Sequence, residues 1–475
     1  MNYNTAFEIV FLTRLILEKR NINWSQELTV VAIVSRSGMG ELKKCLKNSK
    51  LLERQIRFRC GIQNTVFDVL QARAGWQEVV SEEDWDFFWC DREFSKDNYT
   101  GLYLHEHQRM LHFRNHHELT RKNLMVKNLK RLKRQVERDH GKAEGQFAAV
   151  TAISSRKMSI IDKLRRGQNY AEYHIFVEEF KRNPGLVWIM KPAAKSQGKG
   201  IFLFRKLKDI IDWKKSENQL NNDSNKEAPE TYVVQRYIAN PYLIGGRKFD
   251  VRVYVLVTSI APLKIWIYRN GFARFSNTRY SLDAISDSFI HLTNVAIQKT
   301  APDYDPEKGC KWSCQDLRQY LYAKHGLEVV KDIFLQIDLT IIRSLQSVQK
   351  IIINDKHCFE ALGYDILIDD QLKVWLIEIN ASPSFTATSK EDYDLKYGLL
   401  TDVFNILDME NRLTGNEKRI GGFDLLWHDG AVHSDDANII SNGANSTHNS
   451  FLGCVNNRKT QLRHIYTQAS SKKIS

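Results

Sequence analysis

The chain has 475 residues, of which 43% are hydrophobic, and a formal net charge of +13. This length and composition indicate a soluble globular protein with a large core. Its seven cysteines are scattered and without paired C-x-x-C spacing, which excludes a disulfide framework and a zinc site of the usual type and fits a reducing cytosol. The positive charge indicates an acidic partner, whether nucleic acid, anionic membrane or an acidic protein tail.

The N-terminal part carries no sustained hydrophobic pattern, and residues 1–60 are expected to be an appendage of uncertain structure. Its apolar stretch, residues 7–17, is interrupted by Arg14 and is too short and too charged to span a bilayer. The compact part is expected to begin near Gly61. Aromatic residues are dense over residues 76–89, which predicts a strand packed against a core.

Residues 120–138 predict an amphipathic helix, because Met125, Leu129, Leu132 and Val136 recur at helical spacing. The other faces of this helix are basic. They carry Lys127, Lys130, Arg131, Lys133, Arg134 and Arg138. Such a surface is usually a solvated helix face, and the alternative is a docking surface for polyanions.

Three further segments have the composition of loops or tails. Residues 141–168 are small, polar and basic and predict a loop or insert, and residues 216–230 predict an exposed loop between the strand-like segments 201–204 and 232–234. Residues 434–449 are rich in Ser, Asn, His and Asp and predict a disordered tail.

Three oxygen-bearing side chains predict a metal site. Residues 363–380 read as two apolar strands joined by a turn, which would bring Asp365 close to Glu378 and Asn380. Glu378 and Asn380 are two residues apart and therefore share one face of a strand, with Ile377 on the other. Carboxylate and carboxamide oxygens suit Mg²⁺ carried by nucleotide phosphates. The alternative is ordinary surface and turn residues, since short acidic motifs match by chance.

A glycine loop between two apolar strands predicts a phosphate site. The strand over residues 187–192 contains Lys191 near its end, and residues 197–201 (Gln-Gly-Lys-Gly-Ile) follow before the next apolar run. The spacing is neither a Walker loop nor a Rossmann fingerprint. Glycines let the backbone approach phosphates closely, and lysines offset their charge. A plain hairpin with exposed lysines is the alternative.

The next segments add polar groups to apolar strands. Residues 233–238 are expected to join two lobes, where backbone amides and an aromatic ring could hold a purine. Residues 247–255 alternate strictly, so Asp250, Arg252 and Tyr254 share one face. Charges in the middle of a core strand are costly unless they are paired or contact a ligand. Asp250 and Arg252 therefore either bind a ligand or pair with each other.

An arginine and small polar donors follow on further strand-like segments. Arg274 lies in residues 271–275, and Thr293 and Asn294 end the motif His-Leu-Thr-Asn. The planar guanidinium of an arginine suits bidentate recognition of a carboxylate. Lys299 could bind the same carboxylate as a point charge.

Taken in order, these motifs resemble the tubulin tyrosine ligase-like family. The resemblance rests on residues 190–192 (Met-Lys-Pro), 197–200 (Gln-Gly-Lys-Gly), 247–252 (Arg-Lys-Phe-Asp-Val-Arg), 291–294 (His-Leu-Thr-Asn) and 378–383 (Glu-Ile-Asn-Ala-Ser-Pro). It implies an ATP-grasp fold of the α/β (α+β) class, in which two lobes clamp ATP between antiparallel sheets, with an additional N-terminal lobe. The expected limits are 61–425 for the catalytic domain, divided into 61–170 (N-terminal lobe), 171–245 (central lobe) and 246–425 (C-terminal ATP-grasp lobe), and 426–475 for a largely disordered tail.

The resemblance also implies a role for each motif. The residues implied to bind ATP are Lys191, Gln197, Gly198, Lys199, Gly200, Ile201, Gln235, Arg236, Tyr237, Ile238, Lys248, Asp250, Thr293 and Asn294. Asp365, Glu378 and Asn380 would hold Mg²⁺, and Arg274 and Lys299 would bind free glutamate. The implied catalytic residues are Arg252, Lys191 and Glu378, with Arg252 stabilising an acyl phosphate and the tetrahedral species that follows it. No general base is assigned.

The implied activity is ATP-dependent ligation of L-glutamate to glutamate side chains or chains on tubulin tails, through an acyl phosphate. The acidic partner would then be tubulin or the microtubule, docked on the basic helix, and accessory subunits are compatible with this reading. Neither nucleic acid nor a membrane is expected as a partner. The implied location is the cytoplasm and cytoskeleton, at the cilium, basal body or flagellar axoneme, and Gln197 favours elongation of existing chains by family analogy.

The chain departs from the family pattern in two places. Residues 147–172 lack the proline-containing segment (Phe-x-Pro-x-Thr) usual in the family, and Val295 stands where other members carry a tyrosine. Two alternatives therefore stay open beside the glutamate ligase. They are a catalytically silent binder of microtubules or polyanions, and a tubulin glycine ligase.

Overall fold

The computed structural model divides the chain into two units, Met1–Gln55 and Ile56–Ser475. It describes residues 55–90, 103–140, 156–158, 171–193, 197–210, 212, 232–305, 310–434 and 448–472. The expectation for residues 1–54 therefore lies outside the described residues, and the fold concerns the second unit. Across the described ranges, no helix has both the length and the apolar character needed to cross a membrane.

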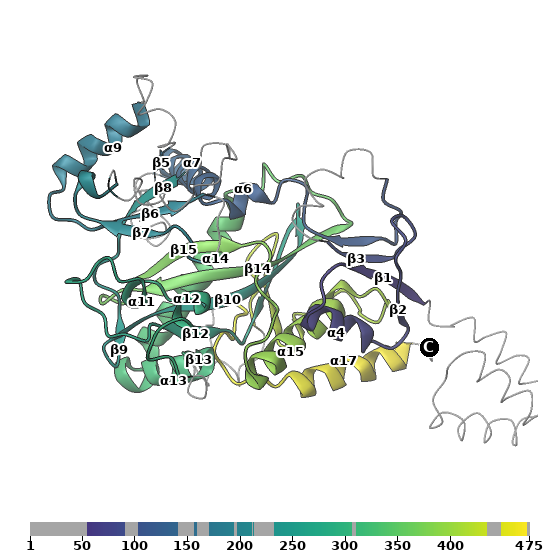
Figure 1. Cartoon of the computed structure of the whole chain (residues 1–475). Helices are drawn as coiled ribbons and strands as arrows, with labels where there is room; N and C mark the ends of the chain where they lie inside the picture. Colours follow the sequence, from purple (N-terminus) through teal and green to yellow (C-terminus); the bar gives the residue numbers. More distant parts are fainter. Residues whose placement is uncertain are drawn as a thin grey trace, which may run out of the picture. The chain divides into compact units, whose positions relative to one another are not determined.

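A large mixed sheet forms the body of this unit (Figure 1). Its strands are β1 (Ile56–Cys60), β2 (Trp76–Glu78), β3 (Phe87–Trp89), β4 (Arg109–Leu111), β9 (Leu243–Ile244), β10 (Arg247–Ile260), β11 (Leu263–Tyr268), β12 (Phe272–Phe275), β13 (Lys311–Ser313), β14 (Cys358–Ile368), β15 (Val374–Asn380), β16 (Arg419–Ile420) and β17 (Phe423–His428). The long strand β14 pairs antiparallel with β10 and β15 and parallel with β4. The N-terminal strands thus continue the sheet of the C-terminal lobe.

The N-terminal edge of the fold differs from the sequence prediction in two details. Strand β1 begins at Ile56, before the expected start at Gly61, because Ile56 and Phe58 alternate into the core. The single strand expected over residues 76–89 is interrupted by an exposed turn, in which the hydroxyl of Ser81 accepts a hydrogen bond from the amide of Asp84. Two short strands, β2 and β3, result.

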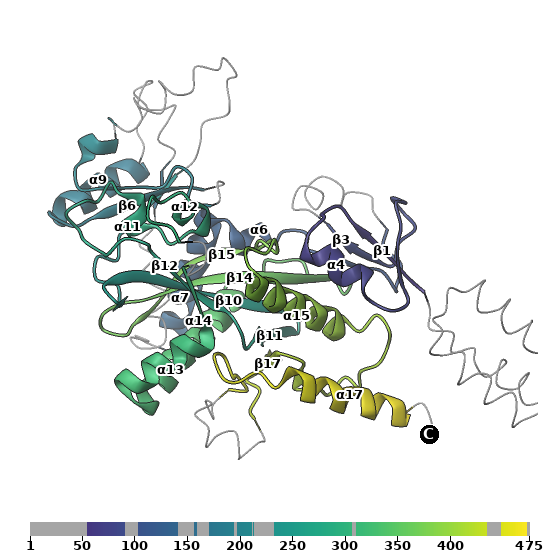
Figure 2. The same ribbon diagram turned by 60° about the horizontal axis from the view of Figure 1, so that its bottom comes forward.

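A second, antiparallel sheet lies apart from the large one. Its order is β5 (Arg156–Met158), β8 (Tyr232–Arg236), β6 (Trp188–Pro192) and β7 (Phe202–Phe204). Helix α9 (Ala171–Arg182) packs on this small sheet, with Phe176 edge-to-face against Trp188 (Figures 1 and 2). The strands predicted around residues 187–192, 201–204 and 232–234 are confirmed. Of the insert predicted over residues 141–168 only 156–158 is described, as a strand, and the loop predicted at 216–230 lies outside the described residues.

Helices cover the large sheet and link its strands. They are α4 (Thr65–Gln71), α6 (His117–Thr120), α7 (Lys122–His140), α11 (Ser288–His291), α12 (Val295–Gln298), α13 (Cys314–His325), α14 (Leu327–Gln346), α15 (Lys390–Leu407) and α17 (Arg458–Lys472). The amphipathic helix predicted over residues 120–138 is confirmed as α7, with Met125 and Leu129 buried. In both views α4 lies beside α15 (Figures 1 and 2).

The C-terminal segment is more ordered than its polar composition predicts. The expectation of a largely disordered tail over residues 426–475 was wrong for the described part, because Phe451 and Leu452 are buried and α17 packs on β16. Ile465 of α17 is buried, and Nε of Arg458 lies 2.7 Å from Oδ2 of Asp402. A few buried apolar side chains and the ion pair with the buried Asp402 therefore order this segment, although most of its residues are polar. Residues 435–447 lie outside the described residues.

Candidate nucleotide and metal site

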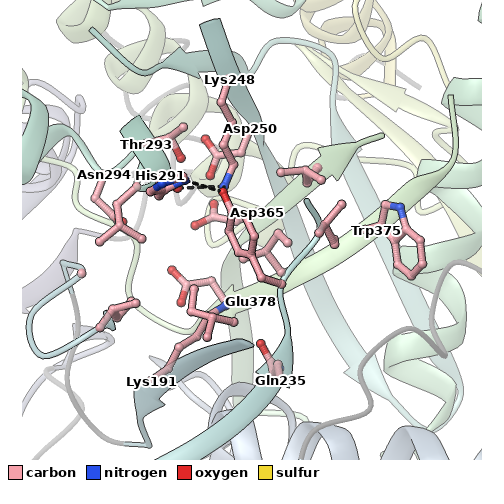
Figure 3. A pocket seen from close by; sticks show the side chains of 18 of the residues that line it. Lys191, Gln235, Lys248, Asp250, His291, Thr293, Asn294, Asp365, Trp375 and Glu378 are labelled. Atoms are coloured by element: carbon pink, nitrogen blue, oxygen red, sulfur yellow. Dashed lines mark hydrogen bonds between the residues drawn. The ribbon is translucent and has the colours of Figure 1, made fainter. Parts of the chain in front are cut away.

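A pocket of about 980 Å³ lies between the small sheet and the β10–β14–β15 part of the large sheet. Lys191 approaches from one side, Lys248 and His291 from the other, and Asp365 and Glu378 lie between them (Figure 3). Apolar side chains, among them Leu367 and Leu376, complete the lining. A mostly apolar cleft with a few convergent charged groups is typical of a ligand site.

The predicted oxygen donors converge on the β14–β15 hairpin. Asp365 is paired in register with Glu378, and Nδ2 of Asn380 lies 3.4 Å from Oδ2 of Asp365. The turn is fixed by Asp369, whose carboxylate accepts hydrogen bonds from the amides that follow it. A bulge shifts the register after Asp365, so Ile377 lines the pocket together with Glu378. The expectation that Ile377 faces away from Glu378 was therefore wrong.

A network of alternating charges forms the buried wall beside Asp365. Nε and Nη2 of Arg252 both donate to the carboxylate of Asp365, and Arg274 bonds both Asp250 and Asp365. All four residues are less than 10% exposed. Asp250 and Arg252 thus do not pair with each other, because the antiparallel neighbours of β10 present better-placed partners on both sides.

The network holds Asp365 in its charged form. Burial alone would raise the pKa of this carboxyl group, but the guanidinium groups of Arg252 and Arg274 outweigh burial and hold the pKa well below its ordinary value. The negative charge of Asp365 is therefore available for a cation at neutral pH.

Three lysines surround the oxygen donors. Burial lowers the pKa of Lys191 to about 8 and that of Lys248 to about 7, although nearby carboxylates oppose the shift. Nζ of Lys122, at the start of α7, lies 3.0 Å from Oε2 of Glu378. Among the described residues, the carboxylates near Lys191 and Lys248 only partly offset the desolvation of these ammonium groups, which is the situation expected where a polyanion binds.

Lys248 is tied into a small polar cluster. Its Nζ donates to the hydroxyl of Tyr237 (3.0 Å) and to the carbonyl of His291 (2.7 Å). The hydroxyl of Tyr237 lies 3.0 Å from Nδ1 of His291. The cluster joins the residue after β8 to β10 and α11 and therefore links the two sheets at one end of the pocket.

The glycine loop lies against the start of α12. Gly198 has a φ of +81°, and a Cβ added there would lie 2.5 Å from Cδ1 of Ile297 and 3.1 Å from Oδ1 of Asn294. Only glycine fits this conformation and this contact. Gln197 and Ile201 line the pocket with Gly198, whereas Lys199 is exposed and Gly200 lies outside the lining.

Most residues expected at the site are brought together. The pocket is lined by Lys191, Gln197, Gly198, Ile201, Gln235, Arg236, Tyr237, Ile238, Lys248, Asp250, Arg274, Thr293, Asn294, Asp365 and Glu378. Arg252 and Asn380 reach it through their hydrogen bonds to Asp365. Arg236 contributes at the backbone, since its guanidinium bonds Glu179 of α9. Lys299 is exposed at the end of α12, and it is not among the residues that line the pocket.

Sequence reasoning missed several residues of the site. Lys122 was overlooked because its partner Glu378 is remote in the sequence, although its place at the start of a basic helix was a signal. The apolar lining residues Ile189, Leu292 and Trp375 carry no sequence signal distinct from core residues. Next to Arg274, β13 brings Lys311 to a second cavity of about 1090 Å³, where its Nζ lies 3.2 Å from Oδ2 of Asp392.

The small antiparallel sheet supplies the buried Lys191, and the antiparallel β10–β14–β15 part of the large sheet supplies the oxygen donors; this arrangement places the protein in the ATP-grasp class of folds. Within this class, the chain belongs to the tubulin-tyrosine ligase family, whose sequence profile matches residues 101–416. The resemblance inferred from the motifs is thereby confirmed.

Curated relatives match most of the chain. A Bos taurus protein named "Probable tubulin polyglutamylase TTLL9" is 54% identical over 444 residues, which cover 88% of this chain and 94% of the relative. The Caenorhabditis elegans protein "Probable tubulin polyglutamylase ttll-9" is 48% identical, covering 80% and 87%. The Tetrahymena thermophila protein "Probable alpha-tubulin polyglutamylase Ttll1" is 42% identical, covering 79% and 94%. The resemblance to the ninth member of the family, predicted from residues 238–243, 269–278 and 344–350, agrees with the names of the first two of these relatives.

Proposed function

We propose that the protein is an ATP-dependent ligase that joins L-glutamate to glutamate residues of tubulin C-terminal tails. The observation that carries this proposal is the convergence of Asp365, Glu378 and Asn380 with the buried Lys191 and Lys248 in one pocket between two sheets. The names of the relatives, all tubulin polyglutamylases, support the choice of substrate.

The residues present fit ATP and Mg²⁺, which ligases of this class use in general. Carboxylate and carboxamide oxygens are the ligands that Mg²⁺ accepts, and two ligands per ion are enough when phosphates supply the rest. Lys191 and Lys248 are buried cations that would compensate phosphate charge. The apolar Leu367 and Leu376 beside backbone segment 235–238 suit a purine ring.

The chain's own residues would act mainly by position and charge. Bound ATP would supply the phosphoryl group that converts the acceptor carboxylate into an acyl phosphate. Lys191 would hold the transferred group in place, and Glu378 would orient the metal ion. Arg252, which is held by its bonds to Asp365, would stabilise negative charge on the acyl phosphate and on the tetrahedral species that forms when the amino group of glutamate attacks.

For the donor amino acid, we keep Arg274 as the candidate ligand. The side chain lines the pocket although it is bonded to Asp250 and Asp365. The exposed position of Lys299 does not support a role for this lysine in binding the donor amino acid. Lys311, which faces the adjoining cavity and pairs in register with Arg274, is the better-placed second cation.

The basic face of α7 is our candidate docking surface for the acidic tail. The helix starts at the pocket, where Lys122 bonds Glu378, and its exposed residues Lys127 and Arg134 lie seven positions apart on one face. A flexible polyanion bound along this face would have its end near the pocket. Microtubules of cilia, basal bodies or flagella, with accessory subunits, are the setting we propose, and neither nucleic acid nor a membrane is needed as a partner.

A direct test combines the full-length protein with microtubules, ATP, Mg²⁺ and labelled glutamate or labelled glycine. We expect glutamate label on tubulin, and its loss in Glu378→Gln, because the substitution removes a charged metal ligand. Glu178→Gln on α9, an exposed glutamate outside the pocket, is the matched control and should retain activity. Incorporation of glycine would indicate a glycine ligase, and absence of label with intact microtubule binding would indicate a silent binder.

A further inference from the structure

His112 lies where strand β4 ends beside β14, and its ring is completely buried. Its φ of +80° is rare for a residue with a Cβ and persists where the surroundings impose it. The two ring nitrogens contact different elements. Nδ1 lies 2.9 Å from Oε2 of Glu360 in β14, and Nε2 lies 3.2 Å from Oγ of Ser382, just beyond β15.

Glu360 fixes the orientation of this ring. The carboxylate is 2% exposed, and its second oxygen accepts a hydrogen bond from the amide of Phe113 at 2.9 Å. Nδ1 and the amide of Phe113 thus share the two oxygens of one buried carboxylate, which fixes the plane of the ring. In this orientation Nε2 is directed at the hydroxyl of Ser382.

His116 brings a third potential metal ligand to this cluster, since donor atoms of His112, His116 and Glu360 lie within 4.8 Å of one another. The two imidazole rings are stacked, with centroids 4.5 Å apart and planes 21° from parallel. The lone pairs lie in the ring planes, so two stacked rings do not direct them at one ion. Nδ1 of His116 is also within 3.0 Å of the carbonyl of Phe113. The cluster is therefore a hydrogen-bonded support rather than a metal centre.

What this cluster supports is the end of the metal-binding strand. Ser382 follows Asn380 by two residues. The next residue, Pro383, packs closely on Gly363, because a Cβ added to Gly363 would lie 3.0 Å from Cβ of Pro383. Gly363 is the register partner of Asn380. Movement of Ser382 would therefore displace Asn380 from its position beside Asp365.

The same N-terminal segment contacts the strand a second time. Ten residues after His112, Lys122 bonds Glu378, and α6, which lies between them, contacts β15. One segment of the N-terminal lobe thus contacts β15 at Glu378 and the chain two residues beyond Asn380.

We propose that His112, oriented by Glu360, is a positioning residue that holds Ser382 and through it sets Asn380 in the Mg²⁺ site. This inference rests on the metal site of the proposed function. Hydrogen bonds that orient metal ligands typically change metal affinity by about 10- to 100-fold when removed. Since Ser382 acts on Asn380 through the backbone, the lower end of that range is expected.

The test measures binding of Mn²⁺, a paramagnetic substitute for Mg²⁺, to the full chain by electron paramagnetic resonance in the presence of a non-hydrolysable ATP analogue. Ser382→Ala should raise the Kd for Mn²⁺ about tenfold without lowering the melting temperature. Ser382→Thr keeps the hydroxyl and should restore binding. Ser384→Ala, an exposed serine in the same segment, is the matched control and should bind like the wild type.

A comparison of single and double variants tests whether Ser382 acts through its contact with His112. His112→Asn, whose residue type tolerates positive φ, should weaken binding to the same extent alone and combined with Ser382→Ala, because both remove one contact. If His112→Asn fails to fold, the three serine variants decide the question.

The outcomes separate this inference from the proposed function. If the wild type binds Mn²⁺ and Ser382→Ala binds it equally well, or if Ser384→Ala is equally impaired, the positioning role is wrong and the metal site stands. If the wild type does not bind Mn²⁺, the metal site is wrong and this inference falls with it.

Discussion

Arg274 is a cationic partner of two buried carboxylates beside the pocket. It bonds Asp250 and Asp365 at once, and all three are nearly inaccessible to solvent. We predict that Arg274→Gln lowers the free energy of unfolding by about 3–5 kcal/mol, because two buried carboxylates lose a cationic partner. Urea unfolding followed by circular dichroism measures this loss.

The accompanying control is Asp250→Asn in the Arg274→Gln background. This second substitution should recover part of the lost stability, since it removes the buried carboxylate of Asp250 that Arg274→Gln leaves without its cationic partner. If Arg274→Gln lowers the free energy of unfolding by less than about 1 kcal/mol, the charge network does not stabilise the fold. Binding of the donor amino acid would then be the remaining role of Arg274.

Lys248 should make nucleotide binding sensitive to pH. Burial lowers the pKa of Lys248 to about 7, although the carboxylate of Asp250 opposes this shift. Its other polar neighbours are Lys191, Tyr237 and His291. Above pH 7 the side chain is mostly neutral and must gain a proton to pair with phosphate, so affinity for ATP should fall as the pH rises from 7 to 9.

Fluorescence titration with a labelled ATP analogue, repeated at several pH values, checks this prediction. In Lys248→Arg the charge persists over the whole range, and the decline should become shallower, with Lys191, whose pKa burial lowers to about 8, accounting for the remainder. Equal slopes for the wild type and Lys248→Arg would contradict the assignment.

At the scale of secondary-structure elements, α7 connects the basic surface to the pocket. We predict that reversing the charge of Lys127 and Arg134 together (Lys127→Glu, Arg134→Glu) weakens microtubule binding at least several-fold at low salt, and that binding of the wild type weakens steeply between low and physiological ionic strength. Cosedimentation with microtubules measures both effects.

Helix α17 offers a control of equal charge for this experiment. Lys459 and Arg463 are also exposed, and reversing both should leave binding nearly unchanged. An equal loss from the two pairs would indicate that net charge, rather than the α7 face, attracts the tail.

The elements also show which sequence signals were sufficient. The hairpin of β14 and β15 was predictable because alternation and a turn signal are local, and they placed Asp365 beside Glu378. The bulge that turns Ile377 into the pocket has no sequence signal of that kind. The order of α17 was missed because its ion pair with Asp402 of α15 and its packing on β16 decide it, and composition averages over such local contacts.

At the scale of the whole described unit, the site depends on pairings between remote segments. The parallel pairing of β4 with β14 carries His112 to Glu360 and, ten residues on, Lys122 to Glu378. A single sequence contains no record of which strands become neighbours, so the motifs predicted the ligand groups of the site but not these supports. The resemblance to the family supplied the fold that local patterns could not.

The central claim, that the pocket between the two sheets holds ATP with Mg²⁺, is tested most directly by thermal unfolding with a non-hydrolysable ATP analogue. At about 100 times the Kd, the ligand should stabilise the wild type by about 2.7 kcal/mol and raise its melting temperature. The rise should require Mg²⁺ and be much reduced in Glu378→Gln. A melting temperature that does not respond to the nucleotide with Mg²⁺, or an equal rise in Glu378→Gln, would contradict the claim.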